Sequence, residues 1–318
     1  MKLLLGNEAI AHGAIAGGVT FFAGYPLAQS SEIDAALIAL LRGREGAAVL
    51  VEDTSAALGA VLGAGAGGGL GATALTGDVL GSAEELVRFG IERKLPGLIA
   101  VIGSRPESSR GVERAGQAEV RRLRIGPTGA GPAPVWAPAS AQECFTLAMA
   151  ASIEAREQST PVLLYVDDVV AHLREPVATP DDGSDREAAA PAGPAELYRT
   201  RDATVLVVAF GIVARAARTA VRLAREQGIR AGLFRPVRLW PFPFAELEEA
   251  AARTRALLVA ELNEGQLLEA IAARVGAARP AAARSTGARD RQAILALSEP
   301  SEGMLRPGRI LDSLREAA

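Results

Sequence analysis

Polar side chains follow several of the expected strands, where each strand gives way to a helix. The stretch GYPLAQSSEI covers 24–33, VLVEDTS covers 49–55 and LTGDV covers 75–79. A helix N-terminus at the carboxyl end of a strand offers free N–H groups to an anionic ligand. The first stretch fits an ordinary strand, turn and helix equally well, with Ser30 or Ser31 as the N-cap. The pattern therefore indicates a ligand site or a structural junction, and both interpretations stay open.

A long loop after the expected strand Pro96–Ser104 carries a second group of polar residues. Loops held by a rigid sheet are where binding residues concentrate. An arginine at a strand exit can hold a carboxylate through two parallel hydrogen bonds. The alternative is a solvated loop whose arginines face water. The residues concerned are Arg105, Ser108, Ser109, Arg110 and Gln117.

Composition and charge exclude several classes of function. The net charge of −3 and the scattered arginines give no electrostatic footprint for nucleic acid or an anionic membrane. The single cysteine, Cys144, excludes an internal disulfide and a cysteine-ligated zinc or iron–sulfur site. The glycines of Gly63–Gly71 close a helix instead of opening one, so they are not a dinucleotide-binding fingerprint. No apolar run suits a signal peptide or a membrane span, which predicts a soluble cytoplasmic protein.

Short apolar runs alternate with helical patterns in the first part of the chain. Helices are expected over 30–43 and 141–158. This alternation is typical of an α/β fold with a parallel sheet covered on both faces, which binds ligands beyond the carboxyl ends of its strands. The expected strands are Val19–Tyr25, Ala47–Asp53, Gly71–Leu75, Pro96–Ser104, Pro134–Pro138 and Pro161–Asp168.

A second α/β segment follows a stretch of linker composition. Residues 175–203 are rich in Pro, Gly, Ala and acids and lack apolar periodicity. The sequence predicts two domains, 1–173 and 204–318, joined by a linker over 174–203. The strands expected in the second domain are 203–211, 229–237, 256–263 and 292–297, with helices over 212–228, 265–276 and 309–317.

Ordered motifs along nearly the whole chain carry a family resemblance. GNEAIAHGAIAGGVTFFAGYPLAQSSEI (6–33), VEDTSAALGAVLGA (51–64), SRPESSRG (104–111), Gln117 and PASAQECF (138–145) follow one another in the first half. VVAFGIVARAARTAV (207–221), FRPVRLWPFP (234–243) and VAELNEGQL (259–267) follow in the second. The set resembles the α subunit of 2-oxoacid:ferredoxin oxidoreductases of the 2-oxoglutarate and branched-chain type.

This resemblance implies a fold, a cofactor and partners. The fold is a pyrimidine-binding thiamine diphosphate domain followed by a transketolase C-terminal-like domain. Thiamine diphosphate with Mg is expected at an interface with a β subunit, and the diphosphate, the Mg and any iron–sulfur cluster are expected on partner chains. A small-molecule 2-oxoacid substrate, a ferredoxin-type electron acceptor and a heterodimer or dimer of heterodimers complete the expectation. No metal ligands are expected in this chain.

Several positions depart from the family pattern. The family's cofactor-activating glutamate aligns with Thr54, which can hydrogen-bond but cannot act as an ionisable partner. The substrate-contacting threonine and the following proline become Ala28 and Gln29, and the TSGPG turn becomes LTGDV. The resemblance assigns cofactor binding to Tyr25, Pro26, Thr54, Thr76, Gly77 and Asp78, with Thr54 at the catalytic position. It assigns substrate binding to Ala28, Gln29, Arg105, Ser109, Gly111 and Gln117.

These departures leave three hypotheses. The chain is a working oxidoreductase subunit, which decarboxylates a 2-oxoacid and forms an acyl thioester with coenzyme A. Alternatively, it is a repurposed member with a changed cofactor or reaction, such as non-oxidative carboligation or biosynthetic acyl transfer. The third hypothesis is a non-catalytic structural partner of the β subunit.

Overall fold

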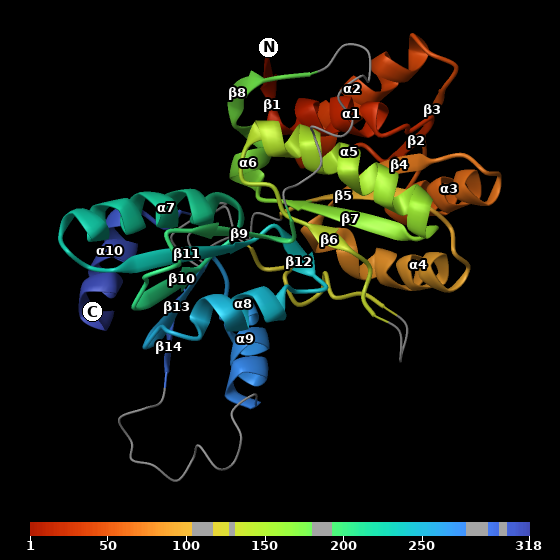
Figure 1. The fold of residues 1–318 in the computed structure, drawn as a ribbon. Coiled ribbons are helices and arrows are strands. Elements are labelled where there is room, and N and C mark those ends of the chain that lie inside the picture. The colour runs from red at the N-terminus through yellow and green to blue at the C-terminus, as the bar shows by residue number, and fades with distance from the viewer. Residues whose placement is uncertain (104–116, 127–130, 180–192, 278–291, 299–303) are drawn as a thin grey trace, which may run out of the picture. The chain divides into compact units, whose positions relative to one another are not determined.

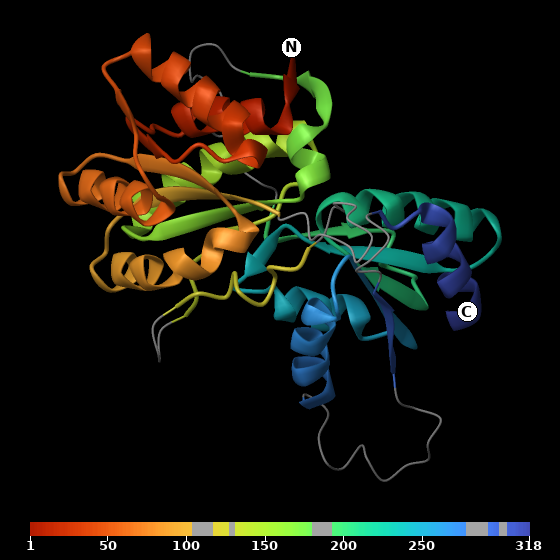
Figure 2. The ribbon, with the colours of Figure 1, turned by 180° about the vertical axis from the view of Figure 1, so that it is seen from behind.

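A computed structural model describes residues 1–103, 117–126, 131–179, 193–277, 292–298 and 304–318. The chain divides into two compact units (Figures 1 and 2), each built around one main sheet. The first unit comprises Met1–Ser104, Arg122–Ala192 and Arg238–Pro241. The second comprises Arg105–Arg121, Gly193–Val237 and Phe242–Ala318.

The first unit contains a seven-stranded sheet in the order β12-β6-β7-β5-β4-β2-β3. All neighbouring strands pair in parallel except β12, which is antiparallel to β6. Strands β4, β5 and β7 are buried along their whole length, as expected of central parallel strands. The bounds are β2 Phe21–Gly24, β3 Ala47–Leu50, β4 Gly71–Thr76, β5 Gly97–Ile102, β6 Val135–Trp136, β7 Pro161–Val166 and β12 Arg238–Trp240.

Helices cover both faces of this sheet. Helices α1 (Gly6–Ala16), α2 (Ser31–Arg42) and α5 (Ala141–Gln158) pack together on one face. Helices α3 (Thr54–Ala66) and α4 (Leu80–Glu92) cover the other (Figure 1). The three layers confirm the predicted α/β class with a parallel sheet.

The start of α3 explains the acids at the end of the VLVED stretch. Strand β3 ends at Leu50, earlier than the predicted Asp53. Asp53 is the N-cap of α3, and its carboxylate accepts a 2.7 Å hydrogen bond from the N–H of Ala56. Because a capping residue has extended backbone and satisfies an otherwise unpaired helix donor, it fixes where the helix begins. Thr54 is consequently the first helical residue.

The second unit has a five-stranded sheet in the order β14-β13-β10-β11-β9, of which only β9 is antiparallel to its neighbour. Helices α7 and α10 pack with buried side chains of the sheet to form its core. The strands are β9 Ala195–Tyr198, β10 Val205–Val208, β11 Ala231–Pro236, β13 Ala256–Glu261 and β14 Ala293–Ser298. The helices are α7 Gly211–Glu226, α8 Phe244–Ala251, α9 Gln266–Ala277 and α10 Pro307–Ala317.

The predicted linker over 174–203 is wrong at both ends. Its first residues form β8 (Arg174–Val177), which pairs antiparallel with β1 (Lys2–Leu5) beyond the short helix α6 (Asp168–His172). Its last part contains β9, the edge strand of the second sheet. Both strands are short, and each pairs with a segment distant in sequence, so local composition does not reveal them. Residues 180–192 lie outside the described part of the chain.

The capping role of Asp53 leads to a stability prediction. Asp53→Ala is expected to lower the free energy of unfolding by about 1 kcal/mol, the usual cost of removing an N-cap. Glu52→Ala is the matched control, because Glu52 is a neighbouring acid that is also exposed and lies outside the helix. Urea denaturation of the two variants measures the difference. Equal effects of the two changes would contradict the capping assignment.

Candidate functional site

Three strand ends meet at one edge of the seven-stranded sheet. Strand β2 lies between β3 and β4, and all three run parallel. Gly24 at the end of β2 is in register with Leu50 at the end of β3, and β4 ends at Thr76. Because parallel strands present their carboxyl ends at the same edge, the segments that follow them leave the sheet side by side. This region, termed the β2–β4 edge, consists of residues 24–30, 51–54 and 76–79.

The first segment of the β2–β4 edge depends on a glycine. A side-chain Cβ on Gly24 would lie 2.6 Å from the Cζ of Phe22, so any larger residue would clash with this ring. Tyr25 is half-buried, and Pro26 and Ala28 are exposed. Ala28 begins the short 3-10 helix η1 (Ala28–Ser30), which contains Gln29 and contacts β4. The structure thus brings the predicted residues 25–29 to this edge.

The second and third segments contribute mostly uncharged groups. Thr54 is 7% exposed at the first position of α3. Thr76 ends β4 and is buried, as is Gly77, which opens the 3-10 helix η2 (Gly77–Val79). Asp78 is exposed, which places the added carboxylate of the LTGDV turn in contact with solvent. The edge therefore contains Tyr25 just after β2, Thr54 at the start of α3 and Thr76 at the end of β4.

One acid near this edge was not predicted. Asp34 lies in the first turn of α2 and is only 6% exposed. Its Cγ lies 3.5 Å from the position that a Cβ on Gly24 would occupy. Burial, followed by the negative charge of Glu32, raises the pKa of the Asp34 carboxyl from 3.8 to about 7. The sequence does contain an indication, because Asp34 falls three and seven residues before the buried Leu37 and Leu41.

The predicted substrate residues of the loop are placed differently. Arg105, Ser109 and Gly111 lie outside the described residues. Gln117 belongs to the second unit, where it is fully buried. Its side-chain Nε2 donates to the carbonyl oxygen of Phe210 (3.3 Å), and its Oε1 accepts from the N–H of Leu262 (3.2 Å). Among the described residues, the side-chain amide of Gln117 therefore joins the backbone at Phe210 to the backbone at Leu262 within the second unit.

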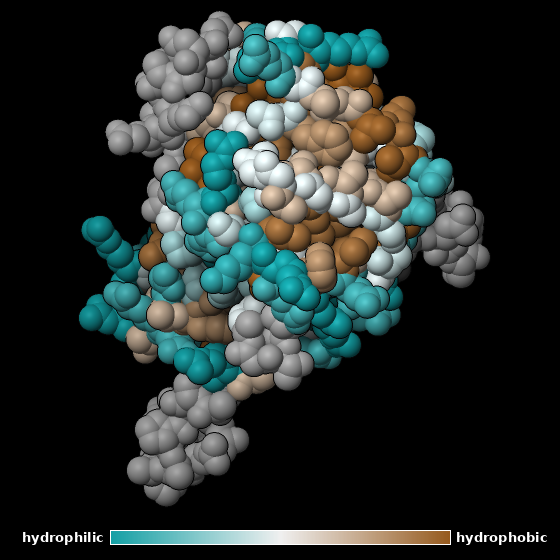
Figure 3. Space-filling model, turned by 90° about the vertical axis from the view of Figure 1, so that its right-hand side faces the viewer, coloured by the Kyte–Doolittle hydropathy of each residue, from teal (hydrophilic) through white to brown (hydrophobic). Residues whose placement is uncertain are grey.

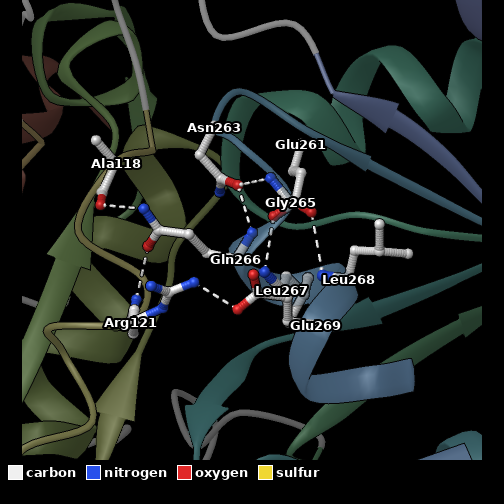
Figure 4. Close-up of polar contacts among 9 residues, drawn as sticks. All are labelled: Ala118, Arg121, Glu261, Asn263, Gly265, Gln266, Leu267, Leu268 and Glu269. Atoms are coloured by element: carbon white, nitrogen blue, oxygen red, sulfur yellow. Dashed lines mark hydrogen bonds and ion pairs between the residues drawn. The ribbon is translucent and has the colours of Figure 1, made fainter. Parts of the chain in front are cut away.

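The VAELNEGQL motif forms the start of α9. Glu261 is fully buried at the end of β13, and its two oxygens accept from the N–H groups of Leu267 (2.9 Å) and Leu268 (3.1 Å). Figure 4 shows this carboxylate directed at the first turn of the helix. Burial raises the pKa of Glu261. Its role, which the sequence analysis did not assign, is to satisfy helix donors that would otherwise be unpaired inside the protein.

The rest of this motif holds the segment that follows the loop (Figure 4). The Oδ1 of Asn263 accepts from the N–H groups of Gly265 (2.9 Å) and Gln266 (2.8 Å). The side chain of Gln266 donates to the carbonyl of Ala118 (2.7 Å) and accepts from the N–H of Arg121 (2.8 Å). These bonds join the start of α9 to residues 118–121 within the second unit.

Family models match both parts of the chain. Residues 12–222 match the thiamine diphosphate-binding domain of pyruvate flavodoxin/ferredoxin oxidoreductases. Residues 203–291 match core domain II of pyruvate:ferredoxin oxidoreductase. Two thirds of the chain thus fall within the first model alone, and it contains every residue of the β2–β4 edge.

Similar proteins agree with these matches. The 2-oxoglutarate synthase subunit KorA of Methanothermobacter marburgensis is 31% identical over 82% of this chain and 88% of its own. A 2-oxoglutarate:ferredoxin oxidoreductase structure from Magnetococcus marinus matches 99% of the chain with a TM-score of 0.81 at 19% identity. The chain spans only 65% of that protein's chain. A split-gene transketolase structure matches 99% of this chain and 98% of its own, with a TM-score of 0.68 at 18% identity.

These comparisons confirm the resemblance and the fold class predicted from the sequence. The two structural likenesses, each under 25% identity, establish the fold alone. The extent of the first family model and the identity to the subunit from Methanothermobacter marburgensis establish membership. The chain belongs to the pyruvate flavodoxin/ferredoxin oxidoreductase family.

Proposed function

We propose that this protein is the α-type subunit of a heteromeric 2-oxoacid:ferredoxin oxidoreductase, with thiamine diphosphate bound at the β2–β4 edge. The observation that carries the proposal is the convergence of three strand ends in the thiamine diphosphate-binding domain of the family. The substrate class is a 2-oxoacid, since the relative from Methanothermobacter marburgensis is named as a 2-oxoglutarate synthase subunit.

The residues of the β2–β4 edge fit an uncharged ring with hydrogen-bonding atoms. The hydroxyls of Thr54 and Thr76 are hydrogen-bonding groups on neighbouring segments. Asp34 adds a buried carboxyl group whose oxygens have no hydrogen-bond partner among the described residues. Thiamine diphosphate, when bound, would stabilise a carbanion of the substrate. In this proposal Tyr25, Pro26, Thr54, Thr76, Gly77 and Asp78 hold its ring.

The substrate would approach from the exposed side of the same edge. Ala28 and Gln29 lie in η1, directly after the Tyr25–Pro26 turn. Arg105, Ser109, Gly111 and Gln117 remain proposed substrate residues, although the hydrogen bonds of Gln117 favour a structural role for its side chain. Thr54 cannot carry the proton that the family's glutamate carries, so the chain needs another acid for that task.

Partners would supply the remaining parts of the enzyme. We expect a β subunit to hold Mg, the diphosphate group and any iron–sulfur cluster, and a ferredoxin-type protein to accept electrons. A heterodimer or dimer of heterodimers in the cytoplasm completes this proposal. Among the described residues, no helix has both the length and the apolar character needed to cross a membrane.

The surface of β3 and α3 supports a contact with the β subunit. Val49 and Leu50 of the edge strand β3 are exposed. Helix α3 carries no charged residue, and a Cβ on its exposed glycines, Gly59 and Gly63, would meet no described atom within 4 Å. Figure 3 faces this side of the molecule, where hydrophobic and neutral residues gather. Such an uncharged face, with room for close approach, suits a subunit interface.

The relatives do not favour the two alternatives. A repurposed enzyme or a non-catalytic partner would keep the same fold, but the relative from Methanothermobacter marburgensis is named as a 2-oxoglutarate synthase subunit. The threonine at position 54 is the feature that would support either alternative.

Activity of the complex tests the proposed function. A complex purified through a tag on this chain is expected to reduce a viologen dye when 2-oxoglutarate or a branched-chain 2-oxoacid is added with coenzyme A. The isolated chain is expected to show no turnover, because the diphosphate and cluster sites lie elsewhere. Robust turnover by the isolated chain, or none by the complex with any 2-oxoacid, would overturn the proposal.

The α3 surface leads to an assembly prediction. Gly63→Leu is expected to prevent co-purification of the β subunit, because the added side chain would project from α3 into the closely packed interface. The isolated chain should stay as stable or gain stability, since a glycine inside a helix costs roughly 0.5–1 kcal/mol. Ala39→Leu, on the exposed face of α2, is the matched control. Normal assembly of the Gly63→Leu variant would show that this face lies outside the interface.

A further inference from the structure

A buried acid in the first unit has no structural partner. Asp34 is only 6% exposed, and neither of its carboxyl oxygens has a hydrogen-bond partner among the described residues. Burying a carboxyl group without hydrogen bonds is costly, and an ionised one costs far more. A leucine would fill the same place on the buried stripe of Ile33, Leu37 and Leu41. Packing alone therefore does not account for an acid at this position.

The position of Asp34 associates it with the β2–β4 edge. Its Cγ lies 3.5 Å from the place of a Cβ on Gly24, the last residue of β2. The ring of Phe22 and the carboxyl group of Asp34 both lie against the side of Gly24 where a side chain would stand. Tyr25 and Pro26 leave the sheet directly after this point. Asp34 thus lies beside the end of β2, the strand that pairs with β3 on one side and with β4 on the other.

The surroundings of Asp34 favour its neutral form. Helix α2 packs against α1, β2 and β3, and the titratable side chains on these elements are Glu8 and His12 of α1. The charge that acts on Asp34 is that of Glu32, which is negative. Burial and this charge raise the pKa of Asp34 to about 7. A substantial fraction of the molecules therefore carries a protonated Asp34 near neutral pH.

A neutral carboxyl group has a specific recognition chemistry. It presents one O–H donor and one carbonyl acceptor side by side. This pair matches a ring nitrogen next to an amino group, which is the edge that an aminopyrimidine offers. We propose that Asp34 is the acid of the candidate site and hydrogen-bonds the aminopyrimidine ring of a bound cofactor. This inference rests on the proposed function, and it places an ionisable group beside the ring in a chain where position 54 is a threonine.

The raised pKa also gives a pH dependence with a definite sign. The folded chain binds this proton more tightly than the unfolded chain, whose pKa is near 3.8. The contribution of Asp34 to stability is therefore present below about pH 4 and is lost as the pH rises through about 7. Asp34→Leu removes this titration, so its melting temperature should fall less between pH 5 and pH 8 than that of the wild type. Melting curves at both pH values measure this difference.

Binding of thiamine diphosphate to the purified complex tests the inference directly. Calorimetric titration at pH 6.5 compares the wild type with Asp34→Leu and with Leu37→Met, a volume-conserving control on the same buried stripe. Asp34→Leu is expected to weaken binding at least tenfold without lowering the melting temperature at pH 8. Leu37→Met is expected to bind within twofold of the wild type. Wild-type affinity should itself fall as the pH rises above 7.

The outcomes separate this inference from the proposed function. If the wild-type complex does not bind thiamine diphosphate, the proposed cofactor is wrong, and the role of Asp34 is overturned with it. If the wild type binds and Asp34→Leu binds equally well, only the role of Asp34 is overturned. If Asp34→Leu does not fold, infrared difference spectra of the wild type decide. The band of a protonated carboxyl group must shift when the cofactor is added, and an unchanged band overturns the inference.

Discussion

Parallel pairing of β2 with β3 on one side and β4 on the other is the constraint on which the candidate site depends. It brings Tyr25, Thr54 and Thr76, which lie far apart in sequence, to one edge of the sheet. The lack of a side chain at Gly24 keeps Phe22 in place beneath β2 and leaves room for Asp34 behind it. Asp53 then fixes where α3 begins. Gly24 and Asp53 would not shape a shared site if the three strands did not end at the same edge of the sheet.

Much of this arrangement could be predicted from the sequence. Apolar runs that alternate with helical patterns predict the strands, and helix α5 has the predicted limits, 141–158. The predicted end of β3 and the predicted limits of the linker are wrong for different reasons. The N-cap Asp53 ends one run of strand-like residues, whereas β8 and β9 depend on partners distant in sequence. The family resemblance predicts the residues of the β2–β4 edge and also Gln117, which lies in the second unit, where its side-chain amide hydrogen-bonds to the backbone.

Buried acids are the part of the structure that sequence patterns indicate least clearly. Asp34 and Glu261 are both nearly inaccessible, and burial raises the pKa of both. Glu261 is satisfied by two helix N–H groups, so its role is structural. Asp34 has no such partner among the described residues, and this is the observation from which we infer that it serves a ligand. This contrast, and not burial itself, distinguishes a structural acid from a functional one.

The structure of the complete complex with thiamine diphosphate tests this account most directly. The account predicts that the aminopyrimidine ring lies at the carboxyl ends of β2, β3 and β4, beside Thr54. An oxygen of Asp34 should then lie about 3 Å from a ring nitrogen, the distance of a hydrogen bond. A ring bound elsewhere, or one bound at this edge while both Asp34 oxygens remain unpartnered, would contradict it.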